Sequence, residues 1–334
     1  MSRRPRVSRG HRAPWRLLPL ALVLALVLAA CGDDDDGGSG TTDRNGDATL
    51  SGSIAIDGSS TVAPLSETAA EDFNAEHTGV QITVGTSGSG GGFEKFCNGE
   101  TDISDASRPI KDEEAQICAD AGIEFVELTV ANDGLSVVVN PENDWADCLT
   151  VAQLNAIWAP ESEGSITSWD QVDPSFPDEP LELFGAGTDS GTFDYFTEAI
   201  NGEEGASRTD YTATEDDNVT VTGVSGARGG IGYFGLSYLE ENADALTGVE
   251  VDGGDGCVYP SVETVQSGDY SPLGRPLFIY VKRDLLERPE GQAFVDFYLQ
   301  NAQAIAEEAL FVPLTEEQQQ DALDAAAALA EGTL

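Results

Sequence analysis

The stretch VQITVGTSGSGGGFEKFC, residues 80–97, decides the fold class of this chain. Residues 80–84 alternate apolar and polar side chains and predict a strand, whereas Phe93 and Phe96, three residues apart, predict a helix. Between them, residues 86–92 form a loop of glycine, serine and threonine. A strand that passes through such a loop into an amphipathic helix is typical of α/β proteins.

The same arrangement occurs twice more. Residues 57–62 (DGSSTV) and 185–192 (GAGTDSGT) also leave a predicted strand and enter a predicted helix. We call residues 57–62, 86–92 and 185–192 the first, second and third loops. Amides in the first turn of a helix lack intrahelical partners and lie at the positive end of its dipole, so three hydroxyl-rich loops of this kind predict an anion site. For any single loop, an ordinary N-cap remains the alternative.

Strands and helices alternate along most of the remaining chain, which predicts an α/β architecture. Further strands are expected at 53–56, 124–130, 135–139, 181–184, 229–235 and 276–281. Further helices are expected at 61–76, 111–121, 151–158, 193–200, 291–306 and 316–330. A chain of 334 residues is long enough for two domains.

Composition excludes several classes of protein. The chain has 16 Lys+Arg against 60 Asp+Glu, a formal net charge of −44, so nucleic acid is not expected as a partner. It lacks a GxxxxGK[ST] loop and a GxSxG motif, and beyond the first 30 residues its one histidine is His77. We therefore expect no enzyme activity, no cofactor and no metal.

The N-terminus predicts export and anchoring. Basic residues 1–16 and the apolar run 17–30 have the order of a signal peptide, and the run ends in LAAC at Cys31, which resembles a bacterial lipobox. We expect a signal peptide at 1–30, a lipidated Cys31 and a flexible acidic tether at 31–49. The protein would then lie at the extracytoplasmic face of the cell membrane. The alternative is an ordinary signal peptide with an incidental cysteine.

Four more cysteines follow: Cys97, Cys118, Cys148 and Cys257. An even number in an exported protein indicates two disulfides, and four cysteines allow three pairings. We favour Cys97–Cys118 and Cys148–Cys257, because the first pair is close in sequence and brackets one compact segment.

Longer motifs carry a family resemblance. The segments IDGSSTVAPLSE (56–67), GTSGSGGGFEKFCNGETDISDASRPI (85–110) and GTDSGTFDYFTEAING (187–202) resemble the phosphate-binding lipoproteins of ABC-type phosphate importers, the PstS family. The resemblance implies a type II periplasmic-binding-protein fold, with two α/β domains, two crossing segments and a ligand cleft between the domains. Domain I would comprise 50–133 plus 277–334, and domain II would comprise 134–276. The crossings would lie near 131–134 and 275–279.

The resemblance also implies a set of phosphate ligands. These are Ser60, Thr61 and Val62 in the first loop, Ser89 in the second, and Ser190, Gly191 and Thr192 in the third.

Two positions depart from the family pattern. Ser107 stands where members have an aspartate that accepts the phosphate proton, and we expect Ser107 to be a phosphate ligand as well. Ala186 stands where members have an arginine. We expect Arg108 to supply the positive charge and Asp189, or another carboxylate, to accept the proton. A salt bridge within an acidic protein is the alternative role of Arg108.

The function implied is the capture of inorganic phosphate and its delivery to an ABC permease by a lipid-anchored monomer. A receptor for molybdate, sulfate or arsenate is one alternative, and an extracellular phosphohydrolase is another.

Overall fold

The computed structural model describes residues 50–188 and 190–333. The predicted signal peptide, the Cys31 anchor, the tether and Asp189 lie outside the described residues.

Within the described residues, nine strands form one mixed sheet. Its strand order is β2-β1-β3-β12-β4-β8-β6-β7, and β9 also pairs with β4. Strands β1 and β2 and strands β1 and β3 are parallel, whereas β12 is antiparallel to β3 and to β4. The strands of this sheet are β1 (Gly52–Gly58), β2 (Val80–Gly85), β3 (Ile103–Ala106), β4 (Phe125–Val139), β6 (Glu182–Ala186), β7 (Thr212–Thr214), β8 (Gly230–Gly235), β9 (Thr247–Gly248) and β12 (Gly274–Lys282).

A three-stranded sheet has the order β11-β10-β5. Its strands are β5 (Cys148–Thr150), β10 (Glu250–Asp252) and β11 (Cys257–Val258).

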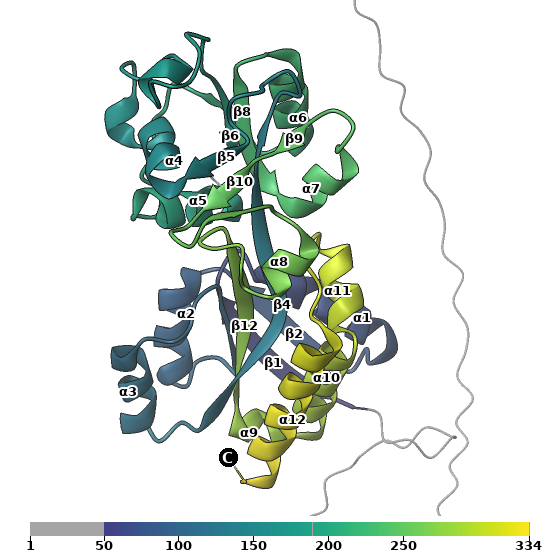
Figure 1. The fold of residues 1–334 in the computed structure, drawn as a ribbon. Coiled ribbons are helices and arrows are strands. Elements are labelled where there is room, and N and C mark those ends of the chain that lie inside the picture. The colour runs from purple at the N-terminus through teal and green to yellow at the C-terminus, as the bar shows by residue number, and fades with distance from the viewer. Residues whose placement is uncertain (1–49, 189, 334) are drawn as a thin grey trace, which may run out of the picture. The chain divides into compact units, whose positions relative to one another are not determined.

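Strand β4 is one continuous strand of 15 residues, whereas the sequence predicts two strands with a break after residue 130. The break does not form because Asn132, Asp133 and Gly134 pair in register with Pro276, Arg275 and Gly274 of β12. Figure 1 shows the two long strands running side by side. Beyond this pairing, β4 continues against β8.

Two large apolar cores lie along β4. One, core 1, combines Val126–Ala131 of β4 with side chains of β1, β12, α1, α10 and α12. The other, core 2, combines Leu135–Val139 of β4 with Trp158, Trp169, Phe196 and Tyr233. The backbone therefore passes from one core to the other at residues 132–134, next to the start of β12. This is close to where the family resemblance places its crossings; the domain limits themselves stay a prediction.

The helices of the described residues are α1 (Ala63–Glu76), α2 (Gly88–Cys97), α3 (Asp112–Asp120), α4 (Val151–Trp158), α5 (Gly191–Asn201), α6 (Asp217–Gly226), α7 (Leu236–Glu241), α8 (Val262–Gln266), α9 (Arg283–Leu286), α10 (Pro289–Gln300), α11 (Ala302–Glu308) and α12 (Glu316–Glu331). Helices α1 to α5 and α12 lie close to predicted helices, whereas α6 to α9 lie where the sequence pattern predicted none. Two 3₁₀ turns lie at Pro160–Ser162 and Trp169–Gln171. The helix predicted at 291–306 is in fact two, because Asn301 ends α10 and begins α11. Helix α2 starts inside the glycine-rich second loop, earlier than predicted.

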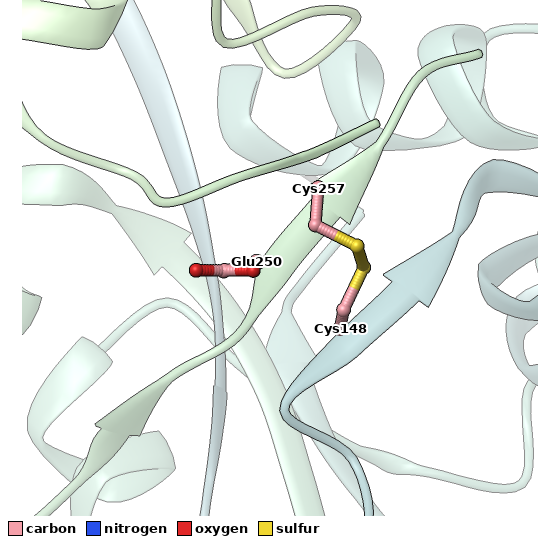
Figure 2. A group of neighbouring side chains, drawn as sticks. All are labelled: Cys148, Glu250 and Cys257. Atoms are coloured by element: carbon pink, nitrogen blue, oxygen red, sulfur yellow. A yellow bond between two sulfur atoms is a disulfide. The ribbon is translucent and has the colours of Figure 1, made fainter. Parts of the chain in front are cut away.

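Both favoured disulfides are confirmed. Cys97 of α2 is bonded to Cys118 of α3, with a sequence separation of 21. Cys148 of β5 is bonded to Cys257 of β11, which joins the two outer strands of the three-stranded sheet (Figure 2). Across residues 50–188 and 190–333, no helix combines the length and apolar character that a membrane span needs.

Candidate functional site

A cavity of about 380 Å³ lies between the first two loops and helix α5. We call it the loop cavity. Most of its wall is hydroxyl-bearing or glycine backbone, its cations lie towards residues 107–111 and β12, and its carboxylates come from α5 and the segment after it. Its lining residues are Ser59, Ser60, Thr61, Ser87, Gly88, Ser89, Gly90, Ser107, Arg108, Lys111, Asp194, Tyr195, Glu198, Glu204 and Arg275.

The first two loops bring uncapped helix starts to this cavity. Neither α1 nor α2 has a side-chain hydrogen bond at its N-cap. In α1, the Ala63 and Leu65 amides already donate to backbone carbonyls of the same turn, so the first-turn amides that would serve an anion are those of α2. In the first loop, the Thr61 amide donates to Ser59 Oγ at 3.2 Å and the Val62 amide donates to the Ser59 carbonyl at 3.2 Å. An anion at these amides must therefore displace contacts within the turn. The Val62 side chain is fully buried, so only its backbone can serve a ligand.

Asp57 holds the second loop beside the first. Its carboxylate accepts from the Ser87 amide at 3.0 Å, from Ser87 Oγ at 2.6 Å and from Lys95 Nζ at 2.5 Å. Burial of Asp57 opposes ionisation, but the hydrogen bonds from Lys95 and Ser87 outweigh it and lower the pKa of this carboxyl. Because Ser87 Oγ is bonded to Asp57, it does not cap α2.

Two of the predicted ligands, Ser89 and Ser107, are in direct contact. The Ser107 amide donates to Ser89 Oγ at 3.1 Å, and the two hydroxyl oxygens are 3.2 Å apart. The hydroxyl expected from the second loop thus lies beside the residue that replaces the family's aspartate. Together they present two hydroxyl groups to the loop cavity.

Arg108 also lines the loop cavity, but Glu114 occupies its guanidinium. The two side chains form a bidentate pair, with nitrogen-to-oxygen distances of 2.8 and 2.7 Å. The hydrogen bond to Glu114 raises the pKa of Arg108. The salt bridge that the sequence left open as an alternative is therefore present, and an anion would have to share this arginine with Glu114.

Arg275 is a second arginine on the cavity wall, and sequence reasoning did not select it. It is the second residue of strand β12, its side chain is 14% exposed, and its guanidinium lies 3.5 Å from the centre of the Tyr195 ring. It donates to Asp133 Oδ2 at 3.3 Å through two nitrogens, to the Ser107 carbonyl at 3.3 Å and to Thr61 Oγ1 at 3.4 Å. All four contacts are longer than usual, so none of these partners holds the guanidinium firmly.

The third loop meets the first at Gly191. A Cβ atom added to Gly191 would lie 2.9 Å from Thr61 Oγ1, so a side chain here would push the two loops apart. Ser190 caps α5 by accepting from the Thr192 amide at 3.2 Å. Thr192 lines a second cavity, of about 780 Å³, rather than the loop cavity.

Helix α5 turns acidic residues towards the loop cavity. Asp194 and Glu198 lie one helical turn apart on its wall, and Glu204 follows the helix. Burial, followed by the neighbouring charge of Glu204, raises the pKa of Asp194 although Arg275 opposes this. Helical spacing from Gly191 to residues 194 and 198 could have indicated both carboxylates. Arg275 could have been found as one of few basic residues, placed directly before a buried strand.

Among the described residues, one group has the composition of a metal site: Cys148, Glu250 and Cys257. Figure 2 shows that the two sulfur atoms are bonded to each other. The group therefore offers one carboxylate and no thiolate, which is not a complete ligand set for zinc.

Comparison of this chain with known proteins identifies the class of protein to which this fold and the loop cavity belong. The model of the PBP superfamily domain matches residues 43–302. Protein SphX from Synechocystis sp. is 47% identical over 313 residues, which are 93% of this chain and 87% of that protein. The phosphate-binding protein PstS from Staphylococcus saprophyticus is 39% identical over 93% of this chain and 94% of its own length.

A solved structure agrees with these relatives. The crystal structure of a possible phosphate binding protein from Planctomyces limnophilus is 47% identical, with a TM-score of 0.81, and the match covers 84% of this chain and 99% of that one. The chain belongs to the PBP superfamily and, within it, to the family that includes the SphX and PstS proteins.

Proposed function

We propose that this protein binds inorganic phosphate in the loop cavity and delivers it to the permease of an ABC-type phosphate importer. The observation that carries the proposal is the meeting of two uncapped helix starts, a cluster of hydroxyl groups and a weakly held arginine around one cavity. Relatives named as phosphate-binding proteins support the same ligand. The PstS relative and the solved structure are named as binding proteins, and we propose that this chain is one too and not an enzyme.

The proposed anion ligands come from three parts of the chain. Amides and hydroxyls at Ser60, Thr61 and Val62 and the hydroxyls of Ser89 and Ser107 would form one wall. Ser190, Gly191 and Thr192 would close on the anion from α5, with segments 131–134 and 275–279 acting as the hinge. Hydrogen bonds to a charged group contribute about 1.5–3 kcal/mol each, so a few of them reach micromolar affinity, which corresponds to about −8 kcal/mol.

The positive charge would come mainly from Arg275. Arg108 is bound bidentately by Glu114 at normal distances, whereas the contacts of Arg275 are all long. A guanidinium also suits phosphate better than an ammonium does, because its planar fork matches two phosphate oxygens. Arg108 would add charge at the edge of the site, shared with Glu114.

A carboxylate would select the protonated anion. Asp189 lies outside the described residues, and Asp194 is the carboxyl on the cavity wall whose pKa is raised by burial. A carboxylate that faces the ligand accepts a hydrogen bond from the O–H group of hydrogen phosphate but repels sulfate, which carries no proton near neutral pH. We therefore propose Asp194 or Asp189 for this role.

Calorimetric titration with phosphate, arsenate, sulfate and molybdate tests the proposal. We expect saturation by phosphate and arsenate, and little heat from sulfate. Saturation by sulfate but not by phosphate would instead make the chain a receptor for another oxyanion. Turnover of a chromogenic phosphate ester would revive the phosphohydrolase alternative.

We also propose that Cys31 is lipidated and holds the protein at the extracytoplasmic membrane face as a monomer. Cys31→Ser should release the protein from the membrane fraction or block its processing. A processed Cys31→Ser protein that still sediments with membranes would contradict the anchor.

A further inference from the structure

Asp133 is a buried carboxylate with a single cationic partner. It lies on β4 opposite Arg275 of β12, and its side chain is 8% exposed. Its Oδ2 atom accepts both hydrogen bonds from Arg275, each at 3.3 Å. Among the described residues, no other side chain hydrogen-bonds to this carboxylate. Its ionised form therefore depends on an arginine that also faces the loop cavity.

No other neighbour of Asp133 can replace Arg275. Helix α5 brings Tyr195, whose own pKa is raised first by burial and then by the charge of Asp133. On its other side Asp133 lines the 780 Å³ cavity, where every charged residue among the described lining is acidic. Those residues are Asp217, Glu240, Glu241 and Glu307. Burial already raises the pKa of Asp133, although the charge of Arg275 opposes this.

We propose that bound phosphate and Asp133 compete for Arg275, so that phosphate capture draws the guanidinium away from Asp133 and Asp133 takes up a proton. This inference rests on the proposed phosphate site. In the exchange, the ion pair between Arg275 and Asp133 breaks and a pair between Arg275 and the phosphate oxygens forms. One proton from the buffer bonds to the Asp133 carboxylate, so the buried side chain becomes a neutral acid.

The geometry permits this exchange without a large rearrangement. Arg275 is stacked on Tyr195 and donates to Thr61 Oγ1 and to the Ser107 carbonyl, so its guanidinium already reaches the proposed anion ligands. A small shift towards them would lengthen its already long contacts with Asp133. A buried carboxylate that loses its cation is costly to keep ionised and becomes protonated instead.

The experiment is calorimetric titration of phosphate in two buffers with different ionisation enthalpies, at mildly alkaline pH where free phosphate is the dianion. The wild-type protein should take up close to one proton per phosphate bound. Its affinity for phosphate should therefore fall about tenfold for each unit by which the pH rises. Asp133→Asn, which stays neutral, should take up none and should bind with little pH dependence.

Asp105→Asn is the matched control. It removes a second buried carboxyl whose pKa burial raises, and which accepts a hydrogen bond from Ser66 Oγ rather than from Arg275. Proton uptake should persist in this variant. Uptake that persists in Asp133→Asn, or that disappears in Asp105→Asn alone, would overturn the proposal.

A measurement on the wild-type protein tests the protonation of Asp133 even if Asp133→Asn does not fold. An infrared difference spectrum should gain a protonated carboxylic acid band when phosphate is added. Phosphate binding with neither this band nor proton uptake would overturn the exchange while leaving the proposed function intact. Failure of the wild-type protein to bind phosphate would instead overturn the proposed function itself.

Discussion

Replacing Arg275 by alanine should weaken phosphate binding far more than replacing Arg108. Arg275 is almost buried and donates through long contacts, so an anion can take over several of its hydrogen bonds. Two charge-assisted hydrogen bonds of about 1.5–3 kcal/mol each, less the cost of separating the arginine from Asp133, leave about 2–4 kcal/mol. Arg275→Ala should therefore weaken binding by roughly 30- to 1,000-fold.

Arg108→Ala should cost much less, about tenfold or below, because Glu114 already takes both arms of this guanidinium. The control for a lost positive charge is Arg228→Ala. Arg228 is 47% exposed and pairs with Glu179 and Asp144, away from the lining of the loop cavity. Arg275→Lys should recover only part of the affinity, since an ammonium lacks the planar fork.

Calorimetry with phosphate measures all four variants, and thermal melting checks that each is folded. The reasoning would be refuted if Arg275→Ala bound within about threefold of wild type while Arg108→Ala lost 30-fold or more. Arg108 would then be the principal cation, as the sequence first suggested, and its pairing with Glu114 would have to open in the bound state. Equal losses in Arg228→Ala would point to net charge rather than to either contact.

Three other substitutions test the surroundings of the loop cavity. Gly191→Ala should weaken phosphate binding about tenfold by pushing the third loop from the first, whereas Gly226→Ala, a helical position with open space around it, should change nothing in a calorimetric titration. Asp57→Asn should loosen the second loop and cost about tenfold in affinity, while Asp173→Asn, which removes similar serine contacts on the surface, should not. Burial raises the pKa of Asp105 from its ordinary value of 3.8 to about 7 in the folded protein. Its contribution to stability is therefore full below the lower value and is lost as pH rises through the higher one. The free energy of unfolding in urea of the wild type, relative to that of Asp105→Asn, should therefore decline by on the order of 4 kcal/mol between about pH 4 and pH 8. Unfolding free energies of the two proteins that change in parallel with pH would contradict this.

The sequence predicts most of the fold because its signals are local. Helix α4 begins and ends where the periodicity places it, and the strand predicted at residues 80–84 is extended by one residue in β2. The errors come from long-range pairing. Residues 131–134 look like a break between two strands, yet β12 aligns opposite them and keeps β4 extended. No pattern within the segment itself reports a partner about 140 residues away.

The candidate site was predictable where it is built from loops and not where it depends on packing. Thr61, Ser89 and Ser107 come together on the loop cavity because each follows a parallel strand, or begins the helix after it, at one edge of the sheet. Arg108 was found for the same reason, but its pairing with Glu114 arises from the first turn of α3. Arg275 reaches the cavity only because β12 joins the sheet between β3 and β4.

The strong negative charge of the chain makes the position of these few cations decisive. A net charge of −44 opposes the approach of a dianion at long range, but salt screens such repulsion beyond about 10 Å at 0.1 M. Inside the cavity the balance depends on short contacts, and there each arginine is already paired, Arg108 with Glu114 and Arg275 with Asp133. An anion must therefore replace a carboxylate as the partner of an arginine. The pair of Arg275 and Asp133 has the longer contacts, and its buried acid can become neutral by taking up a proton. Separating this pair therefore costs less free energy than separating Arg108 from Glu114. Selectivity and pH dependence would then both come from carboxylates near Arg275, and not from the overall charge of the surface.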